Sequence, residues 1–296
     1  NPKVYGESSM IHENVEFHNV AELKPRKTDD ALRLARVPDE VRRSLNETAR
    51  KRMLQPDTAE LRFVADGPCR VTLSSEGQTK VTVFNGLFDS RERFMIGPEP
   101  QTVEITLNEK LQQLDALYCR DMAFSPQVRR LIFGIPQRAP VFFHSIEGPN
   151  IRPPEANDVP ARRYLAYGTS ITHGMAAGGP HLCYVSQAAR RLGADLINLG
   201  VGGSAYCENT LADYIARRED WDIATLALSV NMHTFDLETF SKRVCYMVNA
   251  VAGSDTTRPV ACITLYPYFR DFGIEPAGKA FGGTPEAFRQ ALRDAV

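Results

Sequence analysis

Residues 163–296 alternate short apolar runs with amphipathic stretches, and this alternation constrains the fold more than any other feature of the sequence. Consecutive residues in each run are mostly apolar, so both faces of each strand would be apolar. This is typical of strands that are buried on both faces of a sheet. The predicted strands are 163–168, 195–200, 223–230 and 259–266. The predicted helices that follow them are 181–193, 208–218, 237–253 and 284–296. Four β–α units in succession predict an α/β domain built on a doubly wound parallel sheet.

Residues 1–150 have a different rhythm, with short and often alternating runs separated by Gly, Pro or acidic turns. This pattern predicts a β-sandwich or jelly-roll domain. The predicted strands are 60–65, 70–75, 80–85, 102–107, 130–135 and 141–146, and one helix is predicted over 38–54. A segment rich in Pro and polar residues follows at 147–163 and is typical of a linker. We therefore expect an accessory β-sandwich domain over 1–150 and an α/β domain over 151–296.

Composition excludes some classes of function. Lys and Arg number 35 against 36 Asp and Glu, and the resulting net charge of -1 gives no reason to expect binding to nucleic acid or to an anionic membrane. No apolar run is long enough to span a membrane, and the first ten residues do not resemble a signal peptide. The six cysteines form no CxxC pair, as expected for a reduced protein, so we expect a cytoplasmic location. We expect no metal site.

Three polar segments follow the first three predicted strands of the α/β domain: "GTSITHG" (168–174), "NLGVGGSA" (198–205) and "SVNMH" (229–233). Ligands bind beyond the carboxyl ends of the strands in such sheets, so these segments should lie at one rim. Ser170 could be a nucleophile there, with a backbone N–H of Gly203 and the amide of Asn231 as oxyanion donors. Each also has an ordinary alternative, namely turn chemistry, a tight bend or a cap.

The same segments resemble the sequence blocks of the SGNH (GDSL-type) hydrolases. "GTSIT" resembles their G-D-S block, with Thr169 in place of the usual Asp. Asn198, Gly200 and Gly203 match the N-x-G-x-x-G block in full. The third block, G-x-N-D, is reduced to "SVNM", which keeps Asn231 and loses the flanking Gly and Asp. The resemblance covers about residues 160–296 and is closest to a subgroup that carries a β-sandwich domain before the hydrolase domain.

The resemblance implies a flavodoxin-like fold and a serine esterase or acyltransferase that needs no cofactor. Ser170 would be the nucleophile, and the oxyanion hole would be formed by the N–H groups of Ser170 and Gly203 with the side chain of Asn231. The implied substrates are short acyl esters of sugars or other small molecules. Hydrolase and transferase share every residue up to the acyl-enzyme, so both activities stay open. The sequence makes no prediction of the oligomeric state.

The fourth block of the family, D-x-x-H, supplies the catalytic acid and base, and no such pattern follows Asn231. We therefore expect the catalytic Asp and His to lie C-terminal to Val296. Among the histidines present, His173 and His233 follow strand ends and are interpreted as pocket-lining. Neither has a carboxylate nearby in the sequence to orient it.

Two alternatives come from other functional classes. "GVGGSA" (200–205) fits the G-x-G-x-x-A fingerprint of dinucleotide-binding domains, although it follows the second predicted strand rather than the first. A non-catalytic ligand-binding protein is the other alternative, in which the β-sandwich would bind carbohydrate. Against this, the only Trp of the chain, Trp221, lies outside the β-sandwich.

Overall fold

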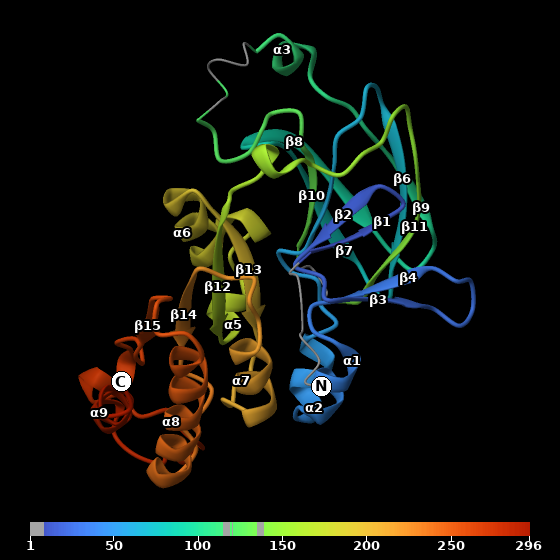
Figure 1. Ribbon diagram of the computed structural model, residues 1–296. Coiled ribbons are helices and arrows are strands. Elements are labelled where there is room, and N and C mark those ends of the chain that lie inside the picture. The colour runs from blue at the N-terminus through green and yellow to red at the C-terminus, as the bar shows by residue number, and fades with distance from the viewer. Residues whose placement is uncertain (1–8, 115–118, 120, 135–138) are drawn as a thin grey trace.

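The computed structural model describes residues 9–114, 119, 121–134 and 139–296. The chain folds into two parts that lie side by side (Figure 1). Antiparallel strands form the part that contains the N-terminal half of the sequence, and a parallel sheet with its helices forms the other. Residue 135, the last residue of the strand predicted at 130–135, lies outside the described residues.

The described strands of the C-terminal half form one parallel sheet in the order β13-β12-β14-β15. This order, with the first strand inside and the second at the edge, confirms the predicted doubly wound parallel sheet. The strands are β12 (Arg162–Gly168), β13 (Ala194–Gly200), β14 (Ile223–Ala227) and β15 (Val260–Ile263). The helices are α5 (Ser170–His173), α6 (Tyr184–Leu192), α7 (Asn209–Ala216), α8 (Leu237–Ser254) and α9 (Pro285–Arg293).

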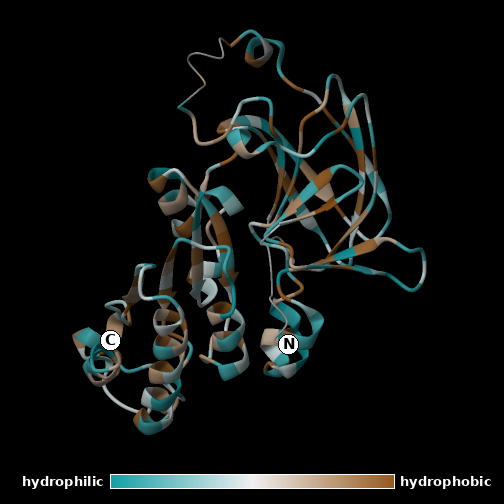
Figure 2. Ribbon diagram, viewed as in Figure 1, coloured by the Kyte–Doolittle hydropathy of each residue, from teal (hydrophilic) through white to brown (hydrophobic). Residues whose placement is uncertain are grey.

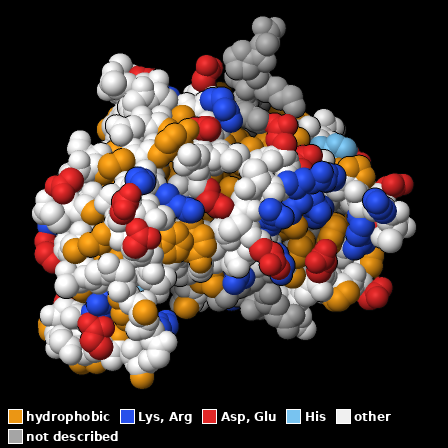
Figure 3. Space-filling view, turned by 90° about the horizontal axis from the view of Figure 1, so that it is seen from below, with side chains coloured by type: hydrophobic (Ala, Val, Ile, Leu, Met, Phe, Trp, Pro, Cys, Tyr) orange, Lys and Arg blue, Asp and Glu red, His pale blue; other side chains and the backbone are white. Residues whose placement is uncertain are grey.

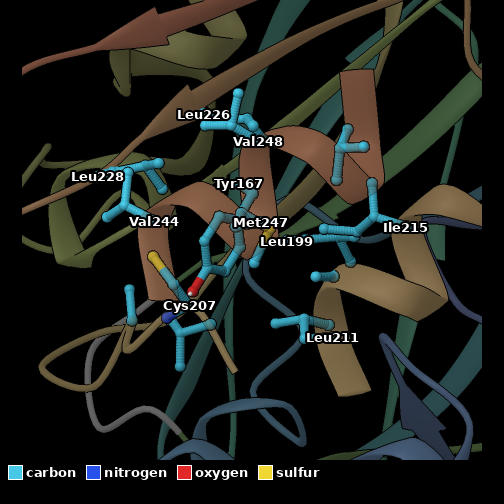
Figure 4. Close-up of a cluster of buried hydrophobic side chains, with 14 of the residues drawn as sticks. Tyr167, Leu199, Cys207, Leu211, Ile215, Leu226, Leu228, Val244, Met247 and Val248 are labelled. Atoms are coloured by element: carbon cyan, nitrogen blue, oxygen red, sulfur yellow. Dashed lines mark hydrogen bonds between the residues drawn. The ribbon is translucent and has the colours of Figure 1, made fainter. Parts of the chain in front are cut away.

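Alternate residues of the central strand β12 point to opposite faces of the sheet, and each face has its own core. Tyr164 and Ala166 pack against α6, whereas Leu165 and Tyr167 pack against the core that contains α7 and α8. Figure 4 shows Tyr167 among the side chains of this second core, with its hydroxyl close to Cys207. The Cys207 N–H donates to the Tyr167 hydroxyl over 3.1 Å, so the buried phenol has a partner.

Among the described residues, the N-terminal half forms two antiparallel sheets, which confirms the predicted β-sandwich. The first sheet, in spatial order, contains β1 (Ser9–His12), β2 (Val15–His18), β5 (Glu60–Phe63), β10 (Arg129–Phe133), β7 (Thr79–Asn85) and β8 (Phe88–Ile96). The second contains β3 (Glu22–Pro25), β4 (Leu32–Ala35), β11 (Val141–Glu147), β6 (Cys69–Ser75) and β9 (Gln101–Ile105). Their inner faces share one apolar core, and Figure 2 shows both apolar and polar residues along the strands.

The helix predicted over 38–54 is two short helices, α1 (Asp39–Ser44) and α2 (Glu47–Arg52). The chain becomes extended at Leu45, and Asn46 caps α2 by accepting a hydrogen bond from the Ala49 N–H. Both helices pack into the core of the α/β domain, through buried residues such as Val41 and Ala49. A further short helix, α3 (Glu109–Gln112), lies in the β-sandwich part.

The β-sandwich side covers the free edge of β13. His18 Nε2 lies 2.7 Å from the Leu196 carbonyl oxygen, and Asn19 Nδ2 donates to the Asn198 carbonyl over 3.2 Å. Near the start of the strand, Arg62 of β5 binds Asp195 through two hydrogen bonds of 2.7 Å. An edge strand leaves backbone groups unpaired, so these side chains satisfy part of an edge that water or another chain would otherwise bind.

Figure 3 shows the molecule from below, where acidic, basic and hydrophobic side chains are interspersed and one group of Lys and Arg side chains stands out. Among the described helices, none combines the length and the apolar character that a membrane span requires.

Candidate active site

Ser170 is the first residue of α5, directly beyond the end of β12. Thr169 caps the helix, because its hydroxyl accepts a hydrogen bond of 3.4 Å from the Ile171 N–H. The helix ends after one turn at Gly174, which has a left-handed φ of 91°. Ser170 is partly exposed, and its hydroxyl makes no hydrogen bond to any described residue. The hydroxyl is therefore available to a ligand at the rim of the sheet.

Two glycines let α5 pack directly on the strand ends. An ideal Cβ at Gly168 would lie 2.2 Å from Thr172 Oγ1, and one at Gly200 would lie 2.3 Å from the His173 backbone nitrogen. Gly168 and Gly200 are aligned in register at the ends of β12 and β13. The segments after these two strands therefore leave the sheet side by side.

Residues 200–205 begin at the last residue of β13 and include Gly203. We call this segment the oxyanion loop, after the role that is proposed for Gly203 below. Gly203 is exposed and has a φ of 77°, a left-handed conformation that glycine adopts without the steric cost of a Cβ. Its N–H has no acceptor among the described residues. An exposed and unpaired N–H group at this rim is available to an anionic ligand atom.

Asn231 follows β14, on the other side of the central strand β12. Its Oδ1 accepts a hydrogen bond of 3.1 Å from the Ala205 N–H. An N–H group can donate only to the oxygen of the side-chain amide. This contact therefore assigns the positions of Oδ1 and Nδ2 in Asn231. The NH2 group of Asn231 is then the free end of the side chain.

Asn198, the remaining residue of the second block, is fully buried and connects β13 to α5. Its Nδ2 donates to the Thr172 carbonyl over 2.9 Å, and its Oδ1 accepts from the Gly200 N–H over 2.8 Å. It therefore holds the helix that carries Ser170 against the start of the oxyanion loop.

His173 is completely buried between the two halves of the chain. Its Nδ1 accepts a hydrogen bond of 3.3 Å from the Gly202 N–H, and its Nε2 lies 2.7 Å from Asp57 Oδ2, off the ideal hydrogen-bond direction. Burial and the nearby Arg36 guanidinium lower the pKa of His173, in spite of the opposing effect of Asp57. The ring is therefore neutral at neutral pH, and both nitrogens face protein groups. His173 contacts the oxyanion loop and has no nitrogen free to act on a substrate.

Asp57 is a residue that sequence reasoning missed. It is fully buried, lies in the loop before β5, and supplies the carboxylate that the sequence did not reveal next to His173. It is separated from His173 by more than a hundred residues, so no local pattern could have indicated the contact.

His233 lies in the loop between β14 and α8 and is half-buried. Its ring stacks on Tyr268 at 6.1 Å and meets the edge of Phe281 at 4.8 Å, both from the segment after β15. Burial, Lys279 and Arg270 lower its pKa. The residue belongs to an aromatic cluster on the β15 side of Asn231.

Ser229 occupies the position of the glycine in the family's third block. Its φ is 101°, in a region that side chains rarely adopt, and its buried hydroxyl has no hydrogen-bond partner among the described residues. Ser229 thus has a backbone conformation that glycine would adopt without the steric cost of a Cβ.

The structure also tests whether the glycines of residues 200–205 could bind a dinucleotide and whether the described residues could hold a metal ion. The glycines of "GVGGSA" do not open a helix, because α7 begins only at Asn209. A dinucleotide pyrophosphate needs a helix N-terminus immediately after the glycines, so the structural context of that fingerprint is missing. Among the described residues, no three His, Cys, Asp or Glu side chains gather in a way that could hold a metal ion.

Comparisons with solved structures show the fold of the whole chain. The salicylyl-acyltransferase SsfX3 from a tetracycline biosynthetic pathway is 15% identical, with 97% of this chain and 79% of that chain covered and a TM-score of 0.71. A family two carbohydrate esterase from Cellvibrio japonicus is 13% identical, with coverages of 97% and 83% and a TM-score of 0.58. The corresponding esterase from Clostridium thermocellum, in complex with cellohexaose, is 12% identical, with coverages of 81% and 77% and a TM-score of 0.53.

No curated protein matches the sequence. Residues 161–274 match the GDSL-like lipase/acylhydrolase family, and this range contains Ser170, the oxyanion loop and Asn231. This part of the α/β domain is therefore similar to the GDSL-like lipase/acylhydrolase family.

Proposed function

We propose that the protein is a serine esterase that forms an acyl-enzyme on Ser170, with short acyl esters of sugars or other small molecules as substrates. The observation that carries the proposal is the arrangement of three strand ends. Ser170 follows the central strand β12, and it is flanked by the oxyanion loop after β13 and by Asn231 after β14. The hydrogen bond from the Ala205 N–H to Asn231 Oδ1 joins the two flanking segments.

In the proposed reaction, Ser170 Oγ attacks the ester carbonyl carbon and loses its proton to a general base. The carbonyl oxygen becomes an oxyanion, which receives hydrogen bonds from the Ser170 N–H, the Gly203 N–H and Asn231 Nδ2. The tetrahedral intermediate collapses, the C–O bond to the alcohol breaks, and the proton passes from the base to the leaving alcohol. Water then attacks the acyl-enzyme in the same way and releases the acid.

No described residue is assigned as the general base. Both nitrogens of His173 face Gly202, Asp57 and Arg36, and its lowered pKa makes it a poor proton acceptor. His233 stacks in its aromatic cluster and also has a lowered pKa. Both are kept as residues around the site.

A second candidate is an acyltransferase that uses a hydroxyl group in place of water. The structure of a salicylyl-acyltransferase is similar over 97% of this chain, which favours the transferase. Carbohydrate esterases have a similar fold, which favours the hydrolysis of sugar esters. The two activities differ only in what attacks the acyl-enzyme.

A panel of acetyl to octanoyl esters, assayed with and without sugar and alcohol acceptors, tests the proposal. Release of acid without an acceptor supports the esterase, and acyl transfer that needs an acceptor supports the transferase. A serine-bound acyl group detected by mass spectrometry on Ser170 supports both. Turnover of no ester together with binding of NAD would overturn the proposal in favour of a dinucleotide-binding protein.

A further inference from the structure

Building on the proposed function, we propose that Arg36 and Arg52, which precede and end the α1–α2 segment, are positioning residues for the oxyanion hole. They act through the backbone of the oxyanion loop and aim the Gly203 N–H at the reacting carbonyl oxygen. The N-terminal half of the chain would thus complete a site whose reacting groups all come from the α/β domain.

Arg36 holds the start of the oxyanion loop. Its side chain is buried, and Nη1 and Nη2 each donate to the Gly200 carbonyl over 3.0 Å. Nη1 also donates to the Asn198 carbonyl over 3.0 Å. Burial lowers the pKa of Arg36 to about 10, against the opposing effect of Asp57, so the guanidinium stays charged at neutral pH. The end of β13 is thereby fixed by a buried cation.

Arg52 binds the peptide that contains the catalytic donor. Its Nε donates to the Gly202 carbonyl over 3.0 Å. The Gly202 C=O and the Gly203 N–H belong to the same peptide group, which is planar and trans, so the two bonds point in opposite directions. Fixing the carbonyl oxygen of Gly202 from one side therefore fixes the direction of the Gly203 N–H on the other.

The charge of Arg52 has a second effect on the same peptide. A charge-assisted hydrogen bond to the carbonyl oxygen draws electron density toward the oxygen and makes the N–H of that peptide a stronger donor. This polarisation acts on Gly203, whose N–H has no competing acceptor among the described residues.

The flanks of Gly203 are held as well. The Gly202 N–H donates to His173 Nδ1 over 3.3 Å, and Asn46 Nδ2 donates to the Ser204 carbonyl over 3.3 Å. The Ala205 N–H is bound by Asn231. The oxyanion loop is thus restrained on both sides of the donor, as preorganised stabilisation of an oxyanion requires.

Arg52 is the residue to test, because it is only partly buried, whereas replacing the fully buried Arg36 could prevent folding. Arg50 provides a matched control on the same helix. Its Nε also donates to a backbone carbonyl, that of Leu45 over 2.6 Å, but Leu45 does not belong to the oxyanion loop. Arg50→Met and Arg52→Met therefore remove the same kind of bond from α2 at different places.

The experiment compares Arg52→Met, Arg52→Lys and Arg50→Met in the natural full-length protein. Steady-state kinetics use the best ester of the panel, and amide hydrogen exchange is measured by mass spectrometry on peptides that cover residues 199–207. For Arg52→Met we expect kcat to fall about tenfold, with KM changed less than about twofold, because the misdirected donor is felt mainly in the transition state. Exchange in 199–207 should rise, Arg52→Lys should restore part of kcat, and Arg50→Met should match the wild type.

Several results would overturn the inference. One is a raised KM with unchanged kcat in Arg52→Met, which would indicate a contact to substrate. Another is an equal loss in Arg50→Met, which would indicate general weakening of α2. Faster exchange with unchanged kcat would show that the contact holds the loop without serving catalysis. A wild-type protein that turns over no ester removes the proposed function and the catalytic part of the inference, and the exchange data then still show whether Arg52 holds the loop.

Discussion

The backbone N–H of Ala205 donates to Asn231 Oδ1 over 3.1 Å and thereby determines that the other end of the Asn231 side chain is a donor. The same contact ties the segment after β14 to the oxyanion loop after β13, on either side of the strand that leads to Ser170. The direction of one proposed oxyanion donor is thus set by the loop that carries the other.

Replacement of Asn231 tests this relationship. Asn231→Ala should lower kcat by roughly 100- to 1000-fold, the usual loss for one oxyanion donor. Asn231→Asp should be at least as damaging, because its carboxylate can still accept from Ala205 but brings a negative charge to the developing oxyanion. Steady-state kinetics on both variants, with thermal unfolding as a check on folding, decide the matter. An Asn231→Asp variant with wild-type kcat would show that the side chain does not face the reacting oxygen.

Ser170→Ala should abolish turnover and leave the protein folded. The hydroxyl makes no hydrogen bond to a described residue and is partly exposed, so its removal should change the free energy of unfolding by no more than about 0.5 kcal/mol. Urea unfolding and ester turnover are the two measurements. Full activity in Ser170→Ala would show that Ser170 is an ordinary turn residue.

The α/β half could be predicted almost element by element from the sequence. Each strand is a short apolar run and each helix has its own local periodicity, so the information lies within the element itself. Strand β8 could not be found in this way, because charged residues such as Arg91 and Glu92 interrupt its pattern at an exposed edge. The break between α1 and α2 could not be predicted in this way. Asn46 can cap α2 only because the backbone is extended at Leu45.

The candidate nucleophile and oxyanion donors could be proposed from the sequence because each directly follows a strand. The residues that hold these groups in place could not be proposed from the sequence. Arg36, Arg52 and Asp57 reach the α/β domain across an interface between segments more than a hundred residues apart. A single sequence does not determine how two such segments are placed relative to each other. An arginine that binds a backbone carbonyl also has no partner side chain from which the contact could be inferred.

Ser229→Gly should stabilise the protein. The Ser229 backbone has a φ of 101°, and a non-glycine residue held in such a region costs of order 1 kcal/mol or more. Ser229→Ala is the matched control, because it removes the unpartnered hydroxyl and keeps the Cβ. After the entropy cost of glycine in the unfolded chain is allowed for, we expect Ser229→Gly to be about 1 kcal/mol more stable than Ser229→Ala. Equal stability in urea unfolding would show that this backbone stores no strain.

Asp195 should link folding stability to pH through the contact between the two halves of the chain. Burial by itself would raise its pKa, but Arg62 and His18 outweigh burial, so the pKa of Asp195 is lowered in the folded protein. Arg62 is also bound by Glu60, whose pKa is lowered by Arg130 and Arg62 against the effect of burial. A carboxylate with a lowered folded pKa stabilises the fold above its unfolded pKa, and this stabilisation is lost as the pH falls through the folded pKa.

Stability should therefore begin to decline as the pH falls below about 4.5, the region of the unfolded Asp and Glu pKa values. Asp195→Asn should lower the free energy of unfolding at pH 7 by about 3 kcal/mol, because it leaves the buried Arg62 short of a partner, and should flatten the acid decline. Glu147→Gln is the control, since the Arg70–Glu147 pair is exposed and should contribute no more than about 0.5 kcal/mol. Urea unfolding of both variants between pH 3 and pH 7 measures these effects. An acid decline in Asp195→Asn as steep as that of the wild type would assign the pH dependence to other carboxylates.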